Sequence, residues 1–118
     1  MVVSVMRTRH NIAAYEEAGL EWHHVPVPSA AEGAEQMEEL LPLLKRDLRR
    51  RGAVAIHGDR HTDFVAAVCA AHMHTERGED PAVALAAAER AGLTVTPAAC
   101  ALLGVEPEEV AAAGRAAA

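Results

Sequence analysis

Three short segments of this chain have the apolar pattern of β-strands, with longer segments between them. Val2–Met6 is a short run rich in β-branched residues, and Ala53–Ile56 is continuously apolar. A continuous run is typical of a central parallel strand covered on both faces, so we expect Ala53–Ile56 to lie in the middle of a sheet. Glu21–Val27 alternates instead, which predicts a strand with Trp22 on one face and His23 on the other.

Helical spacing predicts helices between and after these strands. Residues 10–18 form the first, and a longer helix follows, which Gly52 should end. Ser29 and Glu32 match a capping box before this long helix, and Pro42 should kink or split it. A further helix should run from about residue 64 to residue 77, and three Pro-initiated helices follow it. The apolar stripe of the long helix consists of Met37, Leu40, Leu41, Leu44 and Leu48.

This order of elements predicts an α/β domain. Strands that alternate with helices are typical of three-layer domains, in which helices flank a small, mostly parallel central sheet. We assign residues 1–105 to that domain and residues 106–118 to an Ala-rich helical C-terminal tail.

Charge and composition exclude several classes of partner. The net charge is −6 and the pI is about 5.6, so we expect no nucleic-acid partner. The basic residues at 45–51 end the predicted long helix, where they complement its dipole. No apolar run could span a bilayer and no signal peptide is recognisable, so we expect a cytoplasmic protein with no membrane partner. The alanine- and arginine-rich composition indicates a GC-rich, bacterial genome.

Residues with ionisable side chains are concentrated directly after Ala53–Ile56. Residues 57–63 read His-Gly-Asp-Arg-His-Thr-Asp, and five of these seven residues titrate or carry charge. Ligands of open α/β sheets bind beyond the carboxyl ends of strands, beside helix N-termini, so we expect this loop to line a functional pocket. The alternative is a solvated turn in which Thr62 or Asp63 caps the next helix. The candidate catalytic residues are His57, Asp59, His61 and Asp63.

Other predicted elements end near the same edge of the sheet. Arg7 follows the first strand and could bind a carboxylate or phosphate group, and His10 and His24 lie at or near the ends of neighbouring strands. We therefore expect a small-molecule ligand or substrate at this edge. The candidate ligand-binding residues are Arg7, His10, His24, Gly58, Arg60 and Thr62.

Two stretches of the sequence resemble a known family. Residues 2–27 read VVSVMRTRHNIAAYEEAGLEWHHVPV, and residues 52–71 read GAVAIHGDRHTDFVAAVCAA. Together with the order of elements over residues 2–93, they resemble the cysteine-dependent dual-specificity and atypical protein-tyrosine-phosphatase-like superfamily. The resemblance implies an arginine-containing turn after the first strand and a phosphate loop after the last, where the family has its nucleophilic cysteine.

The residues that carry the family's chemistry are replaced in this chain. Gly58 stands at the position of the nucleophile, and the position of the phosphate-binding arginine falls on Asp63 or, in another register, on His61. No carboxylate is present at Pro28–Ser29, where the family has its general acid. Cys69 lies two turns into the next helix and is better explained as a buried apolar residue. Because the family's reaction requires a positioned thiolate, the sequence excludes a thiolate phosphatase.

Three functions remain open. The first is a repurposed small-molecule enzyme of specialised metabolism that uses His/Asp acid–base chemistry and no cofactor, because a carboxylate beside an imidazole gives a proton donor or acceptor near neutral pH. The second is a non-catalytic pseudophosphatase that binds an anion or a protein partner. The third is a metal-dependent enzyme with His57, Asp59 and His61 as ligands.

The resemblance also bears on assembly. By comparison with that family, we expect its usual first strands to be missing at the N-terminus, so the sheet should be small and should expose an edge. Pairing of two copies across such an edge is one route to a homodimer.

Overall fold

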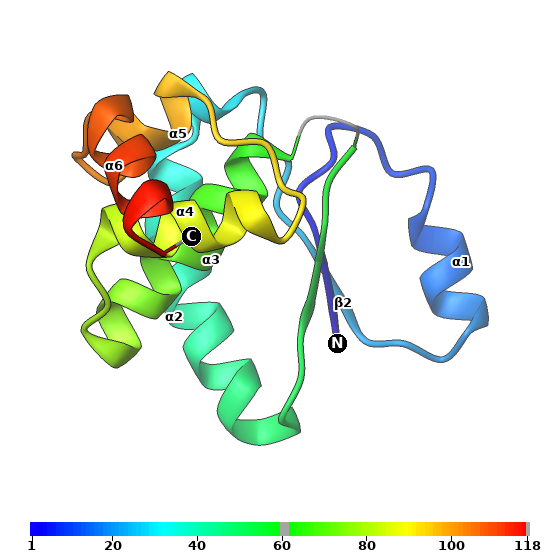
Figure 1. Ribbon diagram of the computed structural model, residues 1–118. Helices are drawn as coiled ribbons and strands as arrows, with labels where there is room; N and C mark the ends of the chain where they lie inside the picture. Colours follow the sequence, from blue (N-terminus) through cyan, green and yellow to red (C-terminus); the bar gives the residue numbers. More distant parts are fainter. Residues whose placement is uncertain (60–61, 118) are drawn as a thin grey trace.

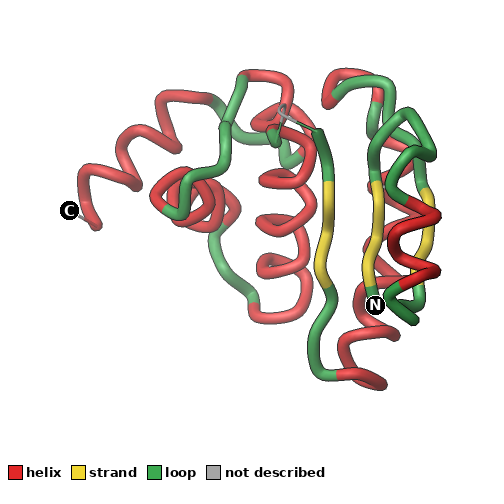
Figure 2. Tube along the Cα trace, turned by 90° about the vertical axis from the view of Figure 1, so that its right-hand side faces the viewer, coloured by secondary structure: helices red, strands yellow, loops and turns green. Residues whose placement is uncertain are grey.

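Three short strands form one parallel sheet. The computed structural model describes residues 1–59 and 62–117. The strands are β1 (Val2–Ser4), β2 (Trp22–His24) and β3 (Ala55–His57). They lie side by side in the order β2-β1-β3, and both pairs are parallel (Figure 2). The prediction of an α/β chain with a small parallel sheet is confirmed.

Helices lie on both sides of this sheet. The short helix α1 (Ile12–Glu17) lies on one side, while α2 (Ala34–Arg51) and α3 (Asp63–Arg77) lie on the other (Figure 1). We call the face toward α1 the outer face and the face toward α2 and α3 the inner face.

The central strand is β1, which corrects the expectation that Ala53–Ile56 is central and covered on both faces. β1 pairs with both neighbours, and its Val3 and Ser4 are 0% and 1% exposed. In β3, Ile56 packs against the core, whereas Ala55 is exposed. Because alanine counts as apolar even when it is exposed, an edge strand with alanine on its open face has the same sequence pattern as a central strand. β3 forms one edge of the sheet within the described residues, and pairing of two copies there stays a prediction.

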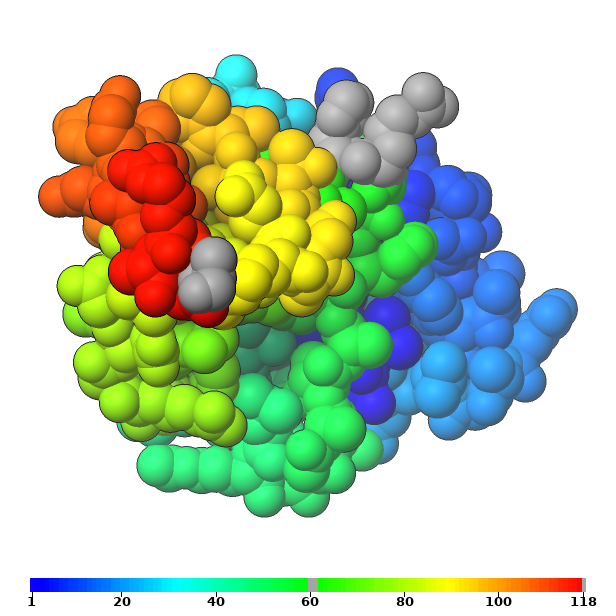
Figure 3. Space-filling view, viewed as in Figure 1, coloured from blue at the N-terminus to red at the C-terminus, as the bar shows by residue number. Residues whose placement is uncertain are grey.

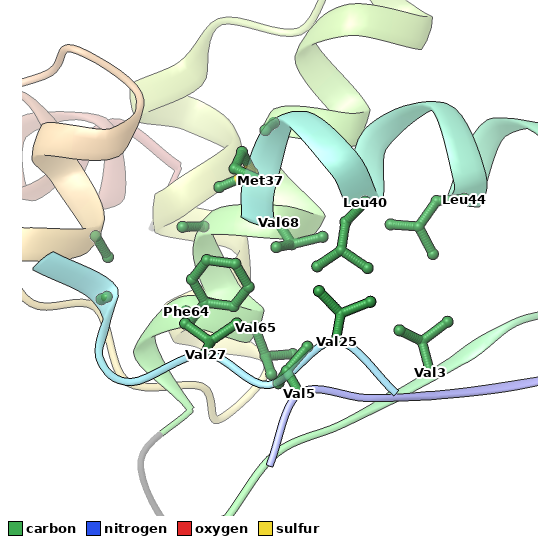
Figure 4. Close-up of a cluster of buried hydrophobic side chains, with 14 residues drawn as sticks. Val3, Val5, Val25, Val27, Met37, Leu40, Leu44, Phe64, Val65 and Val68 are labelled. Atoms are coloured by element: carbon green, nitrogen blue, oxygen red, sulfur yellow. The ribbon is translucent and has the colours of Figure 1, made fainter. Parts of the chain in front are cut away.

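The main core lies on the inner face. Leu40 of α2 and Val68 of α3 are both 0% exposed, and they face Val3 and Val25 of the sheet side (Figure 4). The stripe predicted for the long helix supplies this packing, since Met37, Leu40 and Leu44 are all buried. Burial of each such side chain stabilises the fold by about 1.5–3 kcal/mol.

The long helix begins differently from the prediction. Ser29 precedes a short 3₁₀ helix, η1 (Ala30–Glu32), and makes no side-chain capping hydrogen bond, so the capping box does not form. Gly33 stands at the N-cap of α2 instead. It is packed so tightly that a Cβ added there would lie 2.5 Å from Cε1 of Phe64. The close contact between two chain segments therefore decides where α2 begins.

The long helix also continues through its proline. α2 runs from residue 34 to residue 51 with Pro42 inside it, so the expected break is absent. Leu40 and Leu44 are buried on either side of Pro42 and hold both halves against the core. This packing outweighs the one backbone hydrogen bond that the proline removes.

Three further helices complete the chain: α4 (Pro81–Arg90), α5 (Pro97–Leu102) and α6 (Pro107–Ala117). They gather at the end of the molecule opposite α1 (Figure 3). Leu85 of α4 is 0% exposed and Val110 of α6 is 4% exposed, in one small second core. The segment assigned to a tail from the sequence therefore packs on the body. None of the helices in the described part of the chain is long and apolar enough to cross a membrane.

Candidate functional site

A pocket opens where the three strands end. The cavity has a volume of about 210 Å³, and its walls come from the segment after each strand, the start of α3 and the segment before α5. The carboxyl ends of parallel strands meet at one edge of a sheet, where open α/β sheets bind ligands. We call this cavity the edge pocket. Its lining residues are Val5, Arg7, Val27, Pro28, Ser29, Ala30, Gly58, Asp59, Asp63, Phe64, Thr94 and Thr96.

The walls of the edge pocket are partly apolar and partly polar. Val5, Val27 and Phe64 are buried residues of the main core that also reach the cavity. The hydroxyl groups of Thr94 and Thr96 stand on the segment between α4 and α5. An apolar wall with a few polar groups is the usual composition of a small-molecule site.

The structure brings four of the predicted site residues together around this cavity: Arg7, Gly58, Asp59 and Asp63. They come from the segments after β1 and β3 and from the start of α3. Of the other residues predicted in the loop after β3, Arg60 and His61 lie outside the described residues.

Asp63 joins the starts of two helices. Its Oδ1 accepts the Phe64 backbone N–H at 2.9 Å, and its Oδ2 accepts the Thr96 hydroxyl at 3.0 Å. The Thr96 oxygen in turn accepts the backbone N–H of Ala99 at 3.2 Å, which caps α5. Asp63 therefore has a fixed position in the pocket wall, with both carboxylate oxygens in hydrogen bonds.

Thr62 fixes the neighbouring wall. It stands at the N-cap of α3, and its hydroxyl oxygen accepts the Thr94 backbone N–H at 2.9 Å. This bond ties the segment before α5 to the start of α3. Thr94 and Thr96 were not among the predicted site residues, because the sequence marks Thr96 only as the start of a helix, before Pro97, and gives no signal at Thr94.

Arg7 supplies the positive charge of the edge pocket. Its side chain is exposed, and it makes no hydrogen bond or ion pair with another described residue. Asp59 is also exposed and lines the same cavity. Among the described lining residues, Arg7 is the one cation, and Asp59 and Asp63 are the two carboxylates.

His57 lies away from the edge pocket. Because side chains alternate along a strand, Ile56 points to the inner face and His57 to the outer face. There His57 Nδ1 lies 2.8 Å from the Tyr15 hydroxyl oxygen and 3.5 Å from Asn11 Nδ2. His57 is not among the residues that line the cavity, and acid–base catalysis by His57 or His61 with Asp59 or Asp63 stays a prediction.

The other predicted histidines are held by the loop after β1. His24 Nε2 lies 2.8 Å from the Met6 carbonyl oxygen, to which it donates, and its Nδ1 lies 3.4 Å from Arg9 Nη1. His10 Nδ1 lies 2.7 Å from the Thr8 hydroxyl oxygen. Neither histidine lines the edge pocket.

A buried carboxylate beside a histidine escaped the sequence analysis. Asp47 of α2 is 1% exposed, and its Oδ2 lies 3.3 Å from Nε2 of His23 on β2. The Arg46 Nε donates to the other carboxylate oxygen at 3.3 Å. The signal was present, because Asp47 occupies a position on the stripe that includes Leu40 and Leu44.

Both cysteines are structural. Cys69 of α3 packs against the main core, and Cys100 of α5 is 2% exposed in the second core. Burial raises the pKa of both thiols above the ordinary value, so both favour the protonated form. Among the described lining residues of the edge pocket there is no sulfur nucleophile.

The described residues form no metal-binding group. Across residues 1–59 and 62–117, no three His, Cys, Asp or Glu side chains are placed to hold an ion. Of the three ligands predicted from the sequence, His57 points to the outer face and Asp59 to the edge pocket. The third, His61, lies outside the described residues.

Comparison with known proteins identifies no relative. No family model matches the chain, and neither the curated proteins nor the solved structures contain a match. The edge pocket itself is therefore the basis for assigning a function.

Proposed function

We propose that this chain binds a small polar molecule in the edge pocket, on a phosphatase-like α/β domain that has lost its sulfur nucleophile. The observation that carries the proposal is a cavity at the carboxyl edge of a parallel sheet, lined by Arg7, Asp59 and Asp63. Small-molecule sites combine an apolar wall with a few polar groups that fix the orientation of the ligand, and these charged residues can supply such groups.

Two features support the phosphatase-like origin. The elements follow in the order that the resemblance implies, with an arginine-containing turn after β1, a long helix α2, and a loop and helix after β3. The edge pocket also includes Gly58, which occupies the position of the family's nucleophile. A ligand in this pocket would lie where the family binds phosphate, beside different side chains.

Ligand screening by thermal unfolding tests the proposal, with a pair of matched variants. Thr94 is exposed at the pocket wall, so Thr94→Tyr should fill the cavity. Thr75→Tyr makes the same change at an exposed position of α3 that does not line the cavity. A ligand at 100 times its Kd should stabilise the wild type and the Thr75→Tyr variant by about 2.7 kcal/mol.

The Thr94→Tyr variant should lose that stabilisation while keeping its own unfolding transition. The proposal fails if no small polar molecule stabilises the wild type. It also fails if a stabilising molecule protects the Thr94→Tyr variant equally well.

Acid–base catalysis on the bound molecule is a second candidate function. Asp59 is an exposed residue that lines the same cavity as Arg7 and Asp63. A carboxylate at the wall of a ligand cavity can exchange a proton with a bound molecule. We expect Asp59→Asn to abolish turnover of a converted ligand while its binding persists. Unchanged turnover in that variant would leave binding as the sole function.

The sequence also suggested a non-catalytic anion-binding domain. Inorganic phosphate or sulfate would then stabilise the wild type on its own, and Arg7→Gln would remove the effect. Asp63 argues against this outcome, because its carboxylate occupies the start of α3, where an anion would bind.

A further inference from the structure

We propose that the ligand of the edge pocket is zwitterionic: one small molecule that carries both an anionic group and an ammonium group. This inference rests on the proposed function, and it specifies the chemical class of the ligand. The anionic group would bind Arg7, and the ammonium group would bind the carboxylates of Asp59 and Asp63.

The charges of the pocket wall are the first support. Arg7, Asp59 and Asp63 line the same cavity, which has a volume of about 210 Å³. Arg7 has no hydrogen-bonding or ionic partner among the described residues, so its donors remain available to a ligand. Guanidinium pairs best with carboxylate or phosphate oxygens, to which it can donate two parallel hydrogen bonds.

The start of α3 disfavours a ligand that is only an anion. The free N–H groups of a helix N-terminus ordinarily attract anions. Here the Phe64 N–H already donates to Asp63, and the second Asp63 oxygen accepts the Thr96 hydroxyl. An anion placed at this helix end would therefore meet a fixed negative charge. An ammonium group would instead find unused lone pairs on the same carboxylate, since a carboxylate offers about four acceptor sites.

A ligand that is only a cation is disfavoured by Arg7. Arg7 lines the same cavity as Asp59 and Asp63, so a cation would be attracted by the two carboxylates and repelled by the guanidinium. A molecule with both charges can pair with the guanidinium and with the carboxylates at once.

Size and polarity limit the ligand further. The volume of about 210 Å³ lies below the range of sites for drug-sized molecules, roughly 300–1,000 Å³. Val5, Val27 and Phe64 give the cavity an apolar side as well. We therefore expect an amino-acid-sized molecule whose carbon skeleton can lie against these residues.

A matched series of compounds tests the inference by calorimetric titration. The probes are ω-amino acids from glycine to 6-aminohexanoate, which vary the separation of the two charges, and leucine, which adds an apolar side chain. Each is compared with its carboxamide, which keeps only the amine, and with its deaminated acid, which keeps only the carboxylate. We expect at least one amino acid to bind tenfold or more tightly than both of its singly charged analogues.

Variants assign the two ends of the ligand. In Arg7→Gln the amino acid and its carboxamide should bind equally, and in Asp59→Asn the amino acid should lose most of its advantage over the deaminated acid. Arg9→Gln is the control, because Arg9 lies two residues further along the same loop and does not line the cavity. It should keep the full discrimination of the wild type.

The outcomes separate this inference from the proposed function. Singly charged analogues that bind as tightly as the amino acids would overturn the inference and leave small-molecule binding intact. The same holds if none of the series binds, but a neutral or purely anionic molecule stabilises the wild type and not the Thr94→Tyr variant. If no polar molecule of any class binds, both the inference and the proposed function are wrong.

Discussion

The inner and outer faces of the sheet use the same three strands in different ways. On the inner face, Val3 and Val25 are 0% and 6% exposed beneath α2 and α3. On the outer face, Trp22 and His57 are only half-buried, and their neighbours include the polar groups of Arg9 and Tyr15. The inner face is therefore covered by a large apolar core, whereas the outer face combines buried Ile12 of α1 with polar and aromatic contacts.

The edge pocket lies beyond both faces. Its charged residues stand after the strands or at the start of α3, and none belongs to a strand itself. The sheet thus acts as a scaffold, and the segments after the strands line the proposed ligand site. We therefore expect inner-face substitutions to change stability most, outer-face substitutions to change it less, and pocket substitutions to change binding.

Removing a large side chain from the inner face should have the largest effect. Leu40 is 0% exposed between the sheet and α3, so Leu40→Ala should lower the free energy of unfolding by about 2–5 kcal/mol. Leu20→Ala is the matched control, because Leu20 is 43% exposed. Its cost should stay below about 0.5 kcal/mol. Similar costs in chemical denaturation would contradict the assignment of the core to the inner face.

Adding one methyl group should have opposite effects at two glycines. Gly33→Ala would place a Cβ 2.5 Å from the Phe64 ring and should destabilise the protein by about 1–3 kcal/mol. Gly114→Ala, inside α6, meets its nearest atom at 4.0 Å and should stabilise by about 0.5–1 kcal/mol. Thermal unfolding of both variants checks the signs. A neutral Gly33→Ala would show that the contact between η1 and α3 is looser than described.

Removing the histidine beside the buried carboxylate should cost less than removing a large side chain from the core. His23→Ala leaves the Asp47 carboxylate, 1% exposed, without its imidazole partner, so we expect a loss of about 1–3 kcal/mol. His10→Ala changes an exposed histidine and should be neutral within about 0.5 kcal/mol. The double variant His23→Ala/Asp47→Leu should recover part of the loss. If it is no more stable than His23→Ala, the carboxylate is not the source of the cost.

Removing one outer-face hydroxyl should have the smallest effect of the four. Tyr15→Phe deletes the oxygen that lies 2.8 Å from His57 Nδ1, and we expect a cost of about 0.5–1.5 kcal/mol. Ligand affinity should not change, because neither residue lines the edge pocket. Calorimetry on the same variant measures that affinity. A large loss of binding would show that His57 takes part in ligand binding, as the sequence suggested.

The sequence predicted the fold better than the position of single side chains. The three strands and the main helices could be located, because apolar periodicity depends on which residues are buried. The strand order could not, because Ala53–Ile56 and Val2–Met6 are both short apolar runs and pairing partners are non-local. The break expected at Pro42 was also wrong, since packing on both sides of the proline outweighs a local preference.

The candidate site was predicted in part for a similar reason. The rule for parallel sheets located the pocket after β3, and Arg7, Asp59 and Asp63 do line it. The sequence placed His57 there too, because nearness along the chain does not show which face of a strand a side chain takes. Thr94 and Thr96 were missed because they reach the pocket from a distant segment, through contacts that only the folded chain creates.

Amide chemical-shift mapping during titration with a bound amino acid tests the central claim most directly. We predict that the largest changes occur at Arg7, Gly58 and Thr94, around the edge pocket, and that Asn11 and Tyr15 of the outer face change little. Changes concentrated at Asn11 and Tyr15, or spread evenly over the chain, would show that the molecule does not bind where the strands end.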